Sequence, residues 1–98
     1  MSRSLLERRL TELSGRLATL REELAVTDEQ LGHLAGEADD ARLRALVSET
    51  PLADREHREA QRHADAMARH RADVRARMEP LERQQDELLE RLFAETNG

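Results

Sequence analysis

The sequence predicts an all-α protein, an antiparallel two-helix coiled-coil hairpin, and three observations lead to this prediction. Leucines recur in alternating steps of four and three along the first half of the chain, which is the spacing of the two apolar positions of a heptad repeat. A second apolar seam with the same spacing follows in the second half. Between the halves, Thr50-Pro51 is typical of a helix start, so the chain is expected to turn back there.

The first helix is expected over about residues 4–47, with Ser4 and Glu7 forming a capping box at its start. Its seam runs along Leu6, Leu10, Leu13, Leu17, Leu20, Leu24, Thr27, Leu31, Leu34, Ala38, Ala41 and Ala45. Gly32 and Gly36 place poor helix formers in this pattern. They leave two alternatives open: a continuous helix that is weakened locally, or a break followed by a short third helix from Asp39 or Asp40.

The second helix is expected over about residues 51–94, after a turn at 48–50, with Thr50 as N-cap and Pro51 as its first residue. Its seam comprises Ala60, Ala64, Met67, Arg71, Val74, Met78, Leu81, Gln85, Leu88 and Leu92. Pro80 lies inside this helix, where it removes one backbone hydrogen bond and costs about 3 kcal/mol or kinks the helix.

The two seams match each other when the chain is folded at residue 49. Residues whose numbers add to 98 then face each other, and almost every such pair is apolar. The exceptions are Thr27 opposite Arg71 and Leu13 opposite Gln85, two polar layers of the kind that fix register. This match favours one hairpin domain, residues 1–98, over a parallel dimer. A single two-helix seam buries little surface for its length, which leaves open the pairing of two hairpins into a four-helix bundle, a homodimer.

Composition restricts the function classes. The chain has no cysteine, so disulfides, thiolate metal sites and thiol catalysis are excluded. No apolar run approaches the roughly 20 residues of a membrane span, and no signal sequence is present, so the cytoplasm is the expected location. The net charge of −5 makes nucleic acid an unfavourable partner. All basic residues are arginine, which is typical of a GC-rich, bacterial genome.

The turn end carries the features that suggest binding. If the heptad register continues, Leu43, Leu46 and Val47 point outward, and Leu52 does the same just after the turn. Exposed apolar residues grouped at one end of a polar molecule indicate a protein contact. The alternative is a shift in register that packs these side chains into the hairpin's own cap. Glu49 lies in the turn, close to the acidic residues Glu37, Asp39 and Asp40.

Arginines follow one face of the second helix from the turn, at positions 55, 58 and 62. Such a row can bind an acidic protein or a phosphorylated ligand. Acidic residues interleave with it, which favours a solvated, salt-bridged face instead. The predicted partner-binding residues are Leu43, Leu46, Val47, Glu49, Leu52, Arg55, Arg58 and Arg62.

The acidic turn around Ser48-Glu49 resembles loosely, over a dozen residues, the hairpin tips of the Gre-type transcript-cleavage factors, which implies transcription machinery as a partner. The Asp that this family places three residues before the Glu falls here at Leu46, so transcript cleavage is not expected. Anti-sigma hairpins that bind cyclic dinucleotides are similar in architecture, but their regular Glu, Ser, Arg, Gln, Asp spacing is missing.

No catalytic motif, Gly-rich phosphate loop or Glu-x-x-His metal pair is found. We therefore predict a non-enzymatic protein-binding module, a regulator or adaptor without metal or cofactor that acts through its tip. The alternatives are a structural self-associating bundle and a ligand-sensing or anti-sigma-like hairpin.

Overall fold

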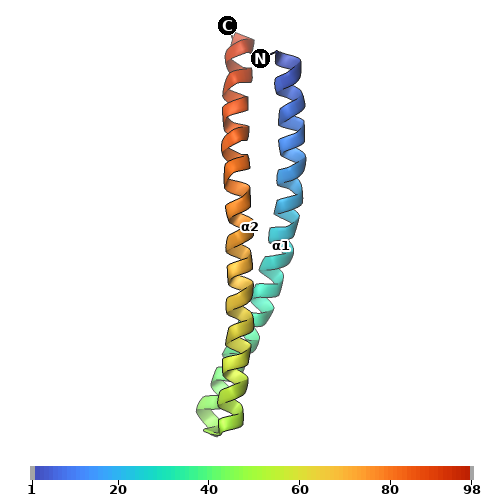
Figure 1. Ribbon diagram of the computed structural model, residues 1–98. Helices are drawn as coiled ribbons and strands as arrows, with labels where there is room; N and C mark the ends of the chain where they lie inside the picture. Colours follow the sequence, from blue (N-terminus) through green and yellow to red (C-terminus); the bar gives the residue numbers. More distant parts are fainter. Residues whose placement is uncertain (1, 98) are drawn as a thin grey trace. The chain divides into compact units, whose positions relative to one another are not determined.

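The computed structural model describes residues 2–97 and consists of two helices that form a hairpin (Figure 1). Helix α1 spans Arg3–Ser48 and helix α2 spans Pro51–Asn97. No strand is present in residues 2–97. The prediction of an all-helical hairpin is confirmed, and both helices extend slightly beyond their predicted ends.

The start of α1 differs from the prediction. Ser2, and not Ser4, is the N-cap: its hydroxyl accepts a hydrogen bond from the Leu5 amide at 3.2 Å, and its carbonyl accepts one from the Leu6 amide at 3.0 Å. Glu7 is therefore not part of a capping box and instead pairs with Arg3 at 3.0 Å. Serine is favoured at the N-cap, so both Ser2 and Ser4 suit this position. With Ser2 as the N-cap, α1 begins at Arg3 and is longer than predicted.

The start of α2 follows the prediction. The Thr50 hydroxyl accepts a hydrogen bond from the Ala53 amide at 3.1 Å, and Pro51 is the first helical residue. A proline is favourable there because its missing N–H would have no partner inside the helix. Asp54 lies in the first turn, where the helix dipole favours a negative charge.

Neither predicted weak point ends a helix. Helix α1 continues through Gly32 and Gly36, so the alternative of a break with a short third helix is wrong. An isolated glycine costs about 1 kcal/mol relative to alanine, and packing of the neighbouring seam residues exceeds this cost. Ala38 and Ala41 are both buried, so the seam continues past the glycines. In the same way, α2 stays helical through Pro80.

The described residues form two compact units, each with one segment from either helix. The first joins the residues up to Glu23 with those from Val74 onward, and the second is Leu24–Asp73. The buried side chains of the first unit are Leu6, Leu13, Leu17, Val74, Met78, Leu81 and Leu88. Those of the second unit are Thr27, Ala38, Ala41, Ala53 and Ala64.

Contacts between the helix segments agree with the predicted register inside each unit. In the first unit, Arg77 pairs with Glu23 at 3.1 Å, and the Gln85 amide donates to the Ser14 hydroxyl at 3.3 Å. In the second unit, Arg71 pairs with Asp28 at 2.5 Å. The numbers in each pair add to 99 or 100, one or two more than those of facing seam positions, because at least one residue of each pair lies beside the seam.

Candidate functional site

The turn that joins the helices has only two residues, and one of them has an unusual backbone conformation. Glu49 has φ of 52°, the left-handed region that glycine adopts far more readily than glutamate. Its amide donates to the Ala45 carbonyl at 3.0 Å, which ends α1 in an αL cap. Thr50 then caps α2. Strain at a non-glycine residue is often found at functional sites, so this end of the chain is a candidate.

The seam next to the turn is built from alanines. Ala38, Ala41, Ala53 and Ala64 are buried, and Ala45 is half-buried. On α2 the seam reaches back through half-buried His57 to Ala53, beyond Ala60, where the sequence prediction began it. Alanine and histidine are common on exposed helix faces, so their identity did not reveal this extension. It could have been found only from the facing seam residues of the first helix, which are Ala41 for His57 and Ala45 for Ala53.

The larger apolar residues of the same segment lie on the surface, as the continued register predicts. Leu43 is 54% exposed, Leu46 63%, Val47 85% and Leu52 61%. Leu43, Leu46 and Val47 are three and four residues apart and therefore form one stripe on α1. They do not pack into the hairpin's own cap, so the alternative of a shifted register is wrong. We call these four side chains the tip patch.

The charged residues predicted for the site are exposed and do not form a cluster with the tip patch. Arg58 pairs with Asp54 one turn earlier, and both side chains are more than half exposed. Such a pair contributes little to stability. Arg55 and Arg62 are exposed and form no ion pair with any residue that the structure describes. Glu49 is exposed in the turn. The structure thus gathers the three α1 members of the tip patch and leaves the arginines on the open face of α2.

The acidic residues before the turn are dispersed on the surface of α1, where Glu37, Asp39 and Asp40 are all exposed. His33 Nε2 lies 3.1 Å from the Glu37 carboxylate, and both side chains are mostly exposed. Within residues 2–97, no group of three or more histidine, cysteine, aspartate or glutamate side chains is placed to hold a metal ion.

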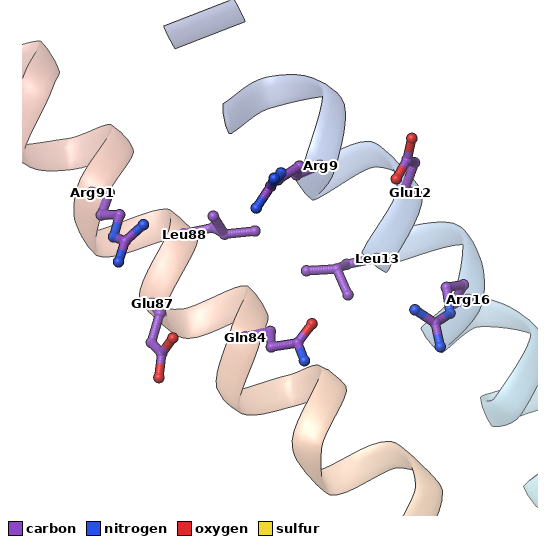
Figure 2. Close-up of a pocket in the computed structure, with 8 residues that line it drawn as sticks. All are labelled: Arg9, Glu12, Leu13, Arg16, Gln84, Glu87, Leu88 and Arg91. Carbon is purple, nitrogen blue, oxygen red and sulfur yellow. The ribbon is translucent and has the colours of Figure 1, made fainter. Parts of the chain in front are cut away.

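A second surface feature lies in the other unit and was missed by the sequence prediction. A shallow hollow of about 430 Å³ lies between the two helices there (Figure 2). It is lined by Arg9, Glu12, Leu13, Arg16, Gln84, Glu87, Leu88 and Arg91. These residues come together only when α1 and α2 are paired. They could have been found in the sequence by pairing the residues on either side of the two predicted seams.

Neither described helix has an apolar stretch long enough to span a membrane. Comparison of the chain with protein-family models, with curated proteins and with solved structures found no match in any of the three.

Proposed function

We propose that the chain is a non-enzymatic binding module, a regulator or adaptor, that attaches to a larger protein through the tip patch. One observation carries this proposal: beside the turn, alanines fill the seam while the larger leucine and valine side chains face solvent. Leucine in the seam would bury more apolar surface and stabilise the hairpin more. The placement of Leu43, Leu46 and Val47 is therefore not explained by the stability of the fold.

The chemistry of the tip patch indicates the kind of partner. Three apolar side chains at helical spacing fit an apolar groove, the mode in which an amphipathic helix binds another protein. Glu49 and the acidic residues before the turn favour a groove with a basic rim, because complementary charge speeds association and fixes orientation. Transcription machinery in the cytoplasm is one assembly that would suit such a tip.

Capture from cell extract tests the proposal. The bait is the full chain, compared with a variant carrying Leu43→Ala, Leu46→Ala and Leu52→Ala. We expect a partner that the unchanged chain retains and the tip variant loses. Circular dichroism should give the same helix content for both, because the three side chains are exposed.

A matched control separates the tip from exposed apolar surface in general. Val26 and Leu89 are 54% and 48% exposed and lie outside the tip patch. The double variant Val26→Ala and Leu89→Ala should retain the partner. Equal retention by the tip variant, or equal loss in both variants, would overturn the assignment of the site.

Light scattering tests the alternative of a structural self-associating bundle. Pairing of two hairpins into a four-helix bundle would double the mass. If the chain forms a tight dimer that the tip variant converts to monomer, the tip patch joins copies of this chain and the proposed partner is wrong.

A further inference from the structure

The hollow of Figure 2 lies on one flank of the seam, where coiled coils usually place opposite charges. On this flank, facing residues have numbers that add to 100. Glu23 and Arg77 are such a pair, and their side chains form an ion pair at 3.1 Å. Two heptads away on the same flank, the corresponding pair is Arg9 and Arg91. Both line the hollow. The Arg9–Arg91 level therefore carries two positive charges, whereas the Glu23–Arg77 level carries opposite charges.

The next pair along this flank adds a third arginine. Arg16 and Gln84 lie between the Glu23–Arg77 level and the Arg9–Arg91 level, and both line the hollow. One heptad separates this level from Arg9 and Arg91, about 10 Å along the helices. None of the three arginines forms an ion pair with a described residue.

Figure 2 shows how the side chains are directed. Leu13 and Leu88 point toward each other across the seam and form an apolar floor, and Arg9 and Gln84 reach from opposite helices toward the space between them. The Glu12 carboxylate points away from that space, and Glu87 and Arg91 both lie on the side of α2 that is turned away from α1 in this view. Among the polar residues that line the hollow, the Arg9 guanidinium and the Gln84 amide are the donors directed toward the space between the helices.

We propose that this hollow binds a small ligand that carries more than one phosphate group. A guanidinium offers planar paired donors that match phosphate oxygens. Arg9 and Arg91 bind one phosphate. Arg16 and Gln84 bind the next. The site is independent of the tip patch and holds whether or not the tip binds a protein.

Isothermal titration calorimetry and thermal unfolding of the full chain with tripolyphosphate test the site. We expect saturable binding with one ligand per chain, and a midpoint of unfolding that rises with ligand concentration, because a ligand that binds only the folded state stabilises it. Sodium chloride at the same ionic strength should not reproduce the rise. An equal rise with chloride would show that only general screening occurs, and would overturn the proposal.

Substitutions locate the site. Arg9→Gln and Arg91→Gln should each raise the Kd for tripolyphosphate about tenfold, the loss of one charge-assisted contact. Arg83→Gln is the matched control, since Arg83 is exposed on α2 and does not line the hollow. Equal effects of all three substitutions would overturn the assignment.

The Arg9→Glu variant distinguishes a loss of ligand binding from a loss of folding. It places opposite charges at the level of Arg91, as in the Glu23–Arg77 pair. Without ligand it should unfold at a higher temperature than the unchanged chain, while it loses the stabilisation by tripolyphosphate. Retention of that stabilisation in a folded Arg9→Glu variant would contradict the proposed site.

Discussion

Arg71 of α2 donates from Nε to the carboxylate of Asp28 on α1 at 2.5 Å, although its sequence position belongs to the apolar seam. Arg71 is half-buried, and its side chain is 42% exposed where it pairs with Asp28. Thr27, its predicted facing residue, is buried. The predicted polar layer of Thr27 and Arg71 is thus present, and the Arg71 guanidinium pairs with the neighbouring Asp28 carboxylate.

Replacing this arginine with leucine should stabilise the hairpin and reduce its specificity. Arg71→Leu removes a polar residue from an apolar seam, and apolar replacements at such layers often raise stability, here by about 1 kcal/mol. Urea unfolding measures the gain, with Arg69→Leu on the exposed face as control. Sedimentation should show additional oligomers for Arg71→Leu. A lower unfolding midpoint would mean that the pair with Asp28 stabilises more than an apolar layer does.

Truncation of leucines should separate the core from the tip patch. Leu17 is fully buried, and Leu17→Ala should cost about 2–5 kcal/mol of unfolding free energy. Leu46 is 63% exposed, and Leu46→Ala should change stability by less than about 0.5 kcal/mol. Chemical denaturation monitored by helix content compares the two. A large loss in Leu46→Ala would show that the tip patch belongs to the core.

The Thr50 hydroxyl should matter more than other threonine hydroxyls. Thr50→Ala removes the acceptor for the Ala53 amide at the start of α2 and should cost about 1 kcal/mol. Thr19 is the matched control: its hydroxyl donates to the Gly15 carbonyl inside α1, where no free amide depends on it. Thr19→Ala should leave thermal stability nearly unchanged. Equal losses in the two variants would contradict the capping role.

The heptad pattern predicted most of the residues that form the core, because leucine and alanine recur at one spacing in both helices, but it missed Ala53 and His57. Every predicted seam position from Leu6 to Ala45 and from Ala60 to Leu92 is buried or half-buried. The exposure of the tip patch followed from the same register. Its use as a binding site, like the roles of Glu49, Arg55, Arg58 and Arg62, stays a prediction.

Other features could not be read from local sequence. Ser2 and Ser4 both suit a helix cap, and the choice between them depends on the backbone at the start of α1. Helix α1 is continuous at Gly36. Local helix propensity does not predict this, because it takes no account of packing against α2. The juxtaposition of Arg9 with Arg91 requires both helices in register, because 81 intervening residues separate the two in the chain.

The glycines of α1 offer a simple test of that continuity. A Cβ built at Gly32 or Gly36 meets nothing within 4 Å. Gly36→Ala should therefore stabilise α1 by about 0.5–1 kcal/mol, since it lowers the backbone entropy lost on folding without creating a clash. Thermal unfolding measures the gain, and Gly32→Ala should behave alike. A destabilised Gly36→Ala variant would indicate that the helix does not run unbroken through this segment.

The strained turn residue gives the prediction that links stability to binding. Glu49 has a positive φ that glycine adopts at little cost, so Glu49→Gly should stabilise the hairpin by about 1 kcal/mol. If Glu49 contacts the partner at the tip patch, the same variant should capture less of it in spite of its higher stability. Glu49→Asn is the control for the backbone, because asparagine also tolerates this conformation and removes the charge. A fall in capture for both variants, together with a higher unfolding midpoint, would assign the carboxylate to binding. Unchanged capture in both would restrict Glu49 to the turn and remove it from the proposed site.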